Sequence, residues 1–181
     1  MRRTATLLAA LAAAGCGGAD SEPIGPSRAA EPQQAALGWR ESYPASGERL
    51  VFAVDTLKVG KDGWSADVSV TNRTGVSFDT GGDGATSAYG LMLFATGDLA
   101  EVEDAAQANR LPAVRRARTV EPPLPKFLAP NETWRGTLSA PGSLADGSWV
   151  RVSFGPLRAR GDPPPEMEAV VVWITDSAHR V

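Results

Sequence analysis

Apolar and polar side chains alternate through Trp64-Ser65-Ala66-Asp67-Val68-Ser69-Val70-Thr71, with the apolar ones at the even positions. Successive side chains of a β-strand point to opposite faces, so this alternation predicts a strand with one buried face. The preceding run 50–59 predicts another strand, and Gly60-Lys61-Asp62-Gly63 between the two is typical of a turn. Together these residues predict an antiparallel hairpin and an all-β interpretation for the neighbouring chain.

Similar short runs follow on the C-terminal side of this hairpin. Strands are expected at 76–78, 89–95, 133–139, 149–157 and 169–175. The last of these is apolar on both faces, which predicts a central strand of a sheet. Only 99–111 departs from the pattern, because its composition favours a helix that Pro112 ends. We therefore predict a mainly β chain, an antiparallel β-sandwich of about seven strands with one short helical or irregular crossover near 98–112.

The composition excludes several classes of protein. The chain has 181 residues, a formal charge of −3, one cysteine and one histidine. These counts exclude a disulfide framework, a cysteine-based zinc site and a multi-histidine metal centre. There is no basic excess of the kind that nucleic-acid-binding proteins carry. His179 lies near the C-terminus outside any catalytic motif, so we expect no enzyme activity, no catalytic or metal-ligating residue and no cofactor.

The N-terminus has the features of a secretory signal. Met1-Arg2-Arg3 is basic, residues 4–14 form an apolar run, and Gly15-Cys16 follows. A run of this length is too short to span a bilayer, which takes about 20 apolar residues. The sequence therefore predicts an exported chain.

Leu11-Ala12-Ala13-Ala14-Gly15-Cys16 resembles the lipobox of bacterial lipoproteins, with Ala13 where the family usually has leucine. The resemblance implies a signal peptide over 1–15, cleavage before Cys16 and a diacylglycerol on the Cys16 sulfur. It implies a chain that is lipid-anchored at the extracytoplasmic face of the cell membrane, with the membrane as its first partner. The alternative is a plain secretory signal with an incidental cysteine.

A change of composition near residue 38 divides the rest of the chain. Residues 16–38 contain three prolines and no aromatic residue, which predicts a flexible lipidated tether. All five tryptophans and both tyrosines lie in 39–181, which we expect to form one β-sandwich domain.

Three segments of this domain resemble the immunoglobulin-like domains of bacterial lipoproteins. They are Asp67-Val68-Ser69-Val70-Thr71-Asn72-Arg73-Thr74-Gly75, Leu128-Ala129-Pro130-Asn131-Glu132-Thr133 and Trp149-Val150-Arg151-Val152-Ser153-Phe154. The resemblance spans residues 48–176, with an insertion at 98–126 that departs from the family. It implies an immunoglobulin-like sandwich with an extracytoplasmic binding or scaffolding role, and it assigns no functional residue.

Two surfaces are candidates for ligand binding. Trp149 and Arg151 share one face of their predicted strand, opposite the apolar face, which suggests an exposed indole beside a charge. The alternative for the tryptophans is ordinary packing in the core. A basic cluster at Arg110, Arg115, Arg116 and Arg118 is suited to anionic lipid head groups or an anionic wall polymer. The alternative for this cluster is a solvated face whose arginines pair locally with Glu101, Glu103 and Asp104.

The acidic, glycine-rich segment Asp79-Thr80-Gly81-Gly82-Asp83-Gly84 offers oxygen ligands for Ca²⁺ but lacks the spacing of an EF-hand. The alternative is an ordinary loop whose glycines supply positive φ angles.

Taken together, these features predict a membrane-anchored extracytoplasmic lipoprotein that acts as a non-enzymatic binding or interaction module for an envelope protein or polymer. Trp149, Arg151, Arg115 and Arg116 are its candidate ligand surface. A carbohydrate-binding or carbohydrate-acting envelope domain is the alternative function.

Overall fold

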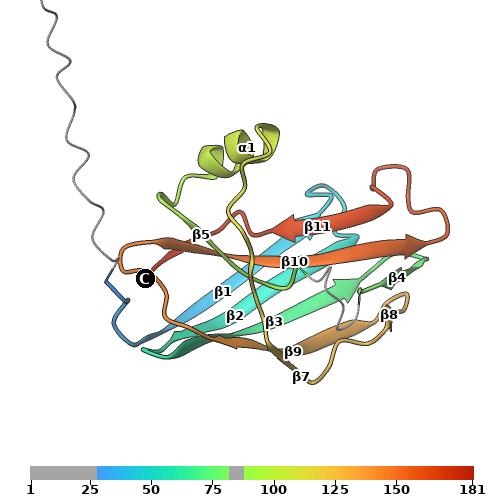
Figure 1. Cartoon of the computed structure of the whole chain (residues 1–181). Coiled ribbons are helices and arrows are strands. Elements are labelled where there is room, and N and C mark those ends of the chain that lie inside the picture. The colour runs from blue at the N-terminus through green and yellow to red at the C-terminus, as the bar shows by residue number, and fades with distance from the viewer. Residues whose placement is uncertain (1–27, 82–87) are drawn as a thin grey trace, which may run out of the picture.

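The computed structural model describes residues 28–81 and 88–181, which form two antiparallel β-sheets packed face to face (Figure 1). One sheet has the order β1-β2-β3-β9-β7. The other has the order β6-β5-β10-β4-β8, with β11 and β12 also paired to β10. The strands of the first sheet are β1 (Gln33–Tyr43), β2 (Leu50–Val59), β3 (Gly63–Asn72), β7 (Thr119–Glu121) and β9 (Thr133–Pro141). Those of the second are β4 (Ser77–Asp79), β5 (Gly90–Phe94), β6 (Arg115–Arg116), β8 (Phe127–Leu128), β10 (Trp149–Arg160), β11 (Val170–Ile174) and β12 (His179–Arg180). The predicted mainly β sandwich is confirmed.

The hairpin of β2 and β3 has the register that the alternation predicts. Val59 lies opposite Trp64 and Leu50 lies opposite Asn72, at the two ends of the pairing. The even-numbered side chains of β3 from Trp64 to Val70 are buried, and the odd-numbered ones are partly exposed. Ser65, Asp67, Ser69 and Thr71 therefore lie on the outer face of the five-stranded sheet, whereas Asn72 at the end of β3 is buried.

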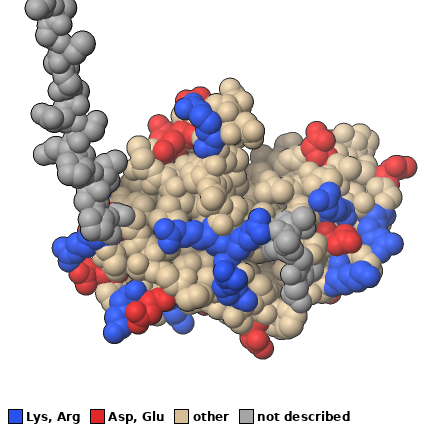
Figure 2. All heavy atoms as spheres, in the orientation of Figure 1, with Lys and Arg blue, Asp and Glu red and all other residues tan. Residues whose placement is uncertain are grey.

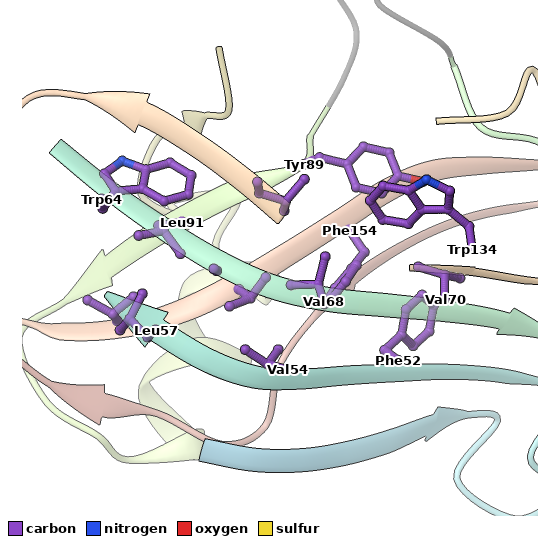
Figure 3. Close-up of a cluster of buried hydrophobic side chains, with 14 of the residues drawn as sticks. Phe52, Val54, Leu57, Trp64, Val68, Val70, Tyr89, Leu91, Trp134 and Phe154 are labelled. Atoms are coloured by element: carbon purple, nitrogen blue, oxygen red, sulfur yellow. The ribbon is translucent and has the colours of Figure 1, made fainter. Parts of the chain in front are cut away.

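Aromatic and aliphatic side chains from both sheets fill the space between them (Figure 3). The Phe52 and Phe154 rings, from opposite sheets, have centroids 5.2 Å apart. Trp64 and Trp134 lie at opposite ends of the labelled cluster (Figure 3), and both are buried. Burying a side chain of the size of phenylalanine or leucine contributes about 1.5–3 kcal/mol, so this cluster is the main source of stability.

The first strand begins earlier than the sequence suggests. Strand β1 starts at Gln33, Ala30 is buried and Ala29 bridges to Ala145. The predicted boundary between tether and domain at residues 38 and 39 is therefore wrong, since ordered structure extends back to residue 29. An edge strand with a half-exposed face needs few apolar side chains, so its weakly apolar sequence resembles a linker.

Strand β11 is at an edge and not in the centre of its sheet, contrary to the expectation for 169–175. In the described chain it pairs with β10 alone, and Val170 and Val172 are 45% and 50% exposed. The continuous apolar run at 169–175 therefore does not correspond to a strand that is buried on both faces.

The predicted helix near 98–112 is confirmed as α1 (Leu99–Gln107). Asp98 caps it, because its side chain accepts a hydrogen bond from the Ala100 amide at 3.0 Å. The helix ends before Asn109, which has a positive φ of 52°. Val102 packs against Met92 and Phe94 of β5, so α1 covers part of the outer face of the second sheet.

The predictions for residues 1–27, including the signal peptide and the Cys16 lipid site, lie outside the described residues. Within 28–81 and 88–181, no helix is both long enough and apolar enough to cross a membrane.

Candidate ligand-binding groove

The chain between α1 and β7 crosses from one sheet to the other at one edge of the sandwich. Strand β6 pairs with β5 through Leu91 opposite Arg115, whereas β7 pairs with β9 through Thr119 opposite Ser139. Between these strands, the Ala117 amide donates to the Tyr89 carbonyl at 2.9 Å, and the Arg118 amide donates to the Ser139 carbonyl at 2.7 Å. Backbone hydrogen bonds to both sheets therefore fix this crossing segment, 114–118, in place.

Gly90 permits the close approach of this segment to β5. A Cβ built on Gly90 would lie 2.2 Å from the Arg115 carbonyl oxygen, a distance that no side chain tolerates. The crossing therefore requires glycine at position 90. The close approach of Arg115 to Gly90 fixes the place on the sheet edge at which the first of the three arginines lies.

A hollow of about 490 Å³ lies along the crossing segment. It is lined by Trp64, Val114, Arg115, Arg116, Ala117, Arg118, Ala140 and Pro141. All three arginines are exposed, whereas Trp64 is only 4% exposed and forms the floor. Figure 2 shows Lys and Arg atoms gathered in a band across the middle of this face, over the chain that joins α1 to β7 in Figure 1. We call this hollow the arginine hollow.

Among the described residues that line the arginine hollow there is no Asp or Glu. Arg115 donates from Nη1 to the Ser143 carbonyl at 2.8 Å, which holds its guanidinium at the rim. Glu101, one of the expected local partners, instead accepts hydrogen bonds from the amide and hydroxyl of Thr96, at 2.9 and 2.7 Å. The bond from the Thr96 side chain is the main reason that the pKa of Glu101 lies below its usual value. The carboxylate of Glu101 therefore binds the neighbouring turn at Thr96 and not the basic cluster.

A second hollow, of about 440 Å³, adjoins the first, with which it shares Trp64, Ala140 and Pro141. Its other lining residues are Lys58, Val59, Gly60, Asp62, Gly63, Ser65, Thr119 and Ser139. We call it the hydroxyl hollow, and the two together the β6 groove.

Three hydroxyl residues of the hydroxyl hollow are in register across neighbouring strands. Ser65 of β3 lies opposite Ser139 of β9, and Ser139 lies opposite Thr119 of β7. Lys58 of β2 lies opposite Ser65 and extends the row by one strand. The row thus runs from Lys58 across the sheet to Thr119. The arginine hollow lies next to the Thr119 end of the row, since Arg118 lines it.

The structure places Arg151 in the interior, contrary to the expectation of a ligand-facing side chain. It is 0% exposed, and its guanidinium donates to the carbonyls of Thr175 (2.8 Å), Asp176 and Gly97 (2.9 Å). Burial lowers its pKa, although nearby carboxylates, Asp176 first among them, act in the opposite direction. Both faces of β10 are covered at this point. The sequence pattern predicts that the face carrying Arg151 is exposed, but α1 and the turns next to it pack over that face.

Trp149 is partly buried and packs against the small apolar cluster of Met92, Phe94 and Val102. A Cβ on Gly97 would lie 2.6 Å from its ring, so the chain before α1 rests directly on the indole. Its ring is therefore not an open stacking platform for a sugar. The structure brings Arg115 and Arg116 together in one hollow, whereas Trp149 and Arg151 both lie against Phe94, outside the lining of that hollow.

The candidate Ca²⁺ segment is described only as far as Gly81, since residues 82–84 lie outside the described ranges. Asp79 accepts a hydrogen bond from the Gly81 amide at 2.9 Å, and the Thr80 hydroxyl donates to Pro125 at 2.7 Å. No group of three or more His, Cys, Asp or Glu residues arranged to hold a metal ion is found in 28–81 and 88–181.

The sequence did not single out Trp64, Pro141 or the hydroxyl row as parts of a site. Their involvement depends on pairing between strands that are distant in the chain, for which no local signal exists. Comparisons with protein-family models, curated proteins and solved structures gave no match.

Proposed function

We propose that this chain is a membrane-anchored extracytoplasmic lipoprotein, and that its β-sandwich is a non-enzymatic binding module with the β6 groove as its ligand surface. The basic start, the apolar run and the lipobox-like residues before Cys16 support the anchor. A diacylglycerol supplies two acyl chains, which is enough to hold a protein stably at a membrane.

The observation that carries the binding role is the charge of the arginine hollow. Arg115, Arg116 and Arg118 are all exposed and line one hollow, in a chain whose formal charge is −3. Like charges placed close together repel one another. A bound anion would relieve that repulsion, so the arrangement favours an acidic ligand.

The chemistry of the lining is suited to binding rather than to catalysis. A guanidinium keeps its proton at neutral pH, so it donates hydrogen bonds but does not exchange protons as a general acid or base. The neighbouring hydroxyls of Ser65, Ser139 and Thr119 both donate and accept hydrogen bonds, whereas a guanidinium only donates them. These groups recognise an anion and its hydroxyl-bearing neighbours.

Photo-crosslinking in the producing cell tests the role of the groove. A photoreactive residue at Pro141, which lines both hollows, is compared with one at Val172 on the exposed edge strand β11. We expect a specific adduct from position 141 that Arg118→Glu abolishes, and no such adduct from position 172. Adducts that are identical at both positions, or that survive Arg118→Glu, would count against the groove as the ligand surface.

A further inference from the structure

We propose that the ligand of the β6 groove is an acidic glycan strand, with its sugar hydroxyls on the hydroxyl row and its acidic groups in the arginine hollow. This inference rests on the proposed function, because it takes the groove to be the ligand surface. It adds the chemical class of the ligand and the direction in which the ligand lies.

The hydroxyl row provides the first argument. Lys58, Ser65, Ser139 and Thr119 are successive partners across β2, β3, β9 and β7. Neighbouring strands lie about 4.8 Å apart, so polar groups recur along the row at that interval. This interval is comparable to the length of one sugar ring in an extended chain. A glycan that lies perpendicular to the strands would therefore meet one polar side chain for each sugar unit.

The arginine hollow provides the second argument. Guanidinium groups bind carboxylates and phosphates through paired, charge-assisted hydrogen bonds, which are stronger than bonds between neutral groups. Arg118 directly precedes Thr119 in the chain, and its amide donates to the Ser139 carbonyl at 2.7 Å. The Thr119 end of the hydroxyl row therefore adjoins the arginine hollow at Arg118. A ligand that fits both needs hydroxyl groups and acidic groups in one chain.

The hydroxyl row favours a single polymer strand over a lipid surface. The two hollows, of about 490 and 440 Å³, share three lining residues and so lie side by side. A glycan strand presents hydroxyl groups along the row and acidic groups beside it in one chain, whereas lipid head groups are not joined into a strand.

Binding of defined polymers to the full chain with Cys16→Ser, purified without lipid, tests the inference. The probes are polygalacturonate, phosphomannan, neutral dextran, inorganic polyphosphate and vesicles that contain phosphatidylglycerol. We expect binding to at least one of the two acidic glycans, which together distinguish a carboxylate from a phosphate. We expect binding of dextran, polyphosphate and vesicles to be at least about tenfold weaker, because dextran lacks acidic groups, polyphosphate lacks hydroxyl groups and the vesicles lack an extended polymer strand.

Two variants and two matched controls assign the binding to the groove. Arg118→Glu should weaken binding of the acidic glycan about tenfold, whereas Arg110→Glu, which makes the same charge change outside the groove, should change it less than about twofold. Ser139→Ala should weaken glycan binding a few-fold, and Ser69→Ala, on the outer face of β3 outside the row, should leave it unchanged. Melting temperatures of all four variants report whether they fold.

The outcomes separate this inference from the proposed function. If neither acidic glycan binds, or if polyphosphate or the vesicles bind as tightly as the glycans, the inference is overturned. The proposed function then still stands if the adduct at position 141 persists in cells and depends on Arg118. If that adduct is also absent, both are wrong.

Discussion

Gly90 and Arg115 are in such close contact that a single added methyl group would collide with the backbone. A Cβ on Gly90 would lie 2.2 Å from the Arg115 carbonyl oxygen, 2.9 Å from its carbonyl carbon and 2.9 Å from the Arg116 Cα. All three of these atoms belong to the backbone, so no side chain can rotate to make room. The position of β6, and with it the arginine hollow, depends on this contact.

We therefore predict that Gly90→Ala destabilises the protein by about 2 kcal/mol and weakens ligand binding at the groove. Chemical denaturation and a binding titration measure the two effects. Gly75→Ala is the matched control, because a Cβ at Gly75 meets no atom within 4 Å. Equal stability of the two variants would contradict the structural role given to Gly90.

The buried Arg151 should behave as a structural residue and not as a ligand contact. Arg151→Met removes the donor to three backbone carbonyls, and leaving buried acceptors without a partner costs about 2–4 kcal/mol in total. Hydrogen exchange should become faster at Gly97 and Thr175, the segments that the guanidinium joins. Arg135→Met, at an exposed position of β9, should change stability by less than about 0.5 kcal/mol. A loss of ligand binding at Arg151→Met without a loss of stability would refute this role.

The carboxylate of Glu101 should make part of the stability dependent on pH. Its folded-state pKa is lowered, chiefly by the hydrogen bond from the Thr96 side chain, so it binds protons less readily in the folded chain than in the unfolded one. The resulting stabilisation is fully present above the ordinary glutamate pKa of 4.5 and is lost as the pH falls through the lower folded-state pKa.

Melting temperatures of the parent chain and of Glu101→Gln, measured from pH 7 to pH 3, test this dependence. We expect the parent to be more stable at pH 7 and the difference to shrink at acidic pH. Glu103→Gln, an exposed neighbour on α1, should show no comparable change. A difference between the parent and Glu101→Gln that is constant with pH would show that the ionised carboxylate is not responsible.

The proposed anchor predicts covalent lipid at Cys16. Metabolic labelling with a fatty-acid analogue should label the chain and place it in the membrane fraction. Cys16→Ser should abolish both the label and stable membrane association, since the sulfur is the proposed attachment atom. Labelling that persists in Cys16→Ser would place the lipid elsewhere.

The sequence predicts the sandwich well because the information is local. The alternation from Trp64 to Thr71 and the turn at 60–63 specify β3 and its pairing with β2. The edge strand β1 was missed because its exposed face and sparse apolar residues resemble a linker. The strands β6, β7, β8 and β12 have only two or three residues each, which is too short for any periodic pattern.

The candidate site was less predictable than the fold because it depends on contacts between distant segments. Arg151 and Ser153 alternate with apolar neighbours and so resemble an exposed face, but the packing of α1 and the turns around Gly97 covers Arg151. The burial of Asn72 was equally unpredictable, because its side chain donates hydrogen bonds to the carbonyls of Leu128 and Ala129, which are more than fifty residues away in the chain. The basic cluster was visible in the sequence, whereas the hydroxyl row beside it required the register of β3, β7 and β9.

Co-sedimentation with cell envelopes that have been stripped of lipid tests most directly whether the β6 groove is the ligand surface. The full chain with Cys16→Ser is compared with the same chain carrying Arg118→Glu or Arg110→Glu. The groove predicts that the parent and the Arg110→Glu variant sediment with the envelope and that the Arg118→Glu variant stays in solution. Equal sedimentation of the two arginine variants would contradict it.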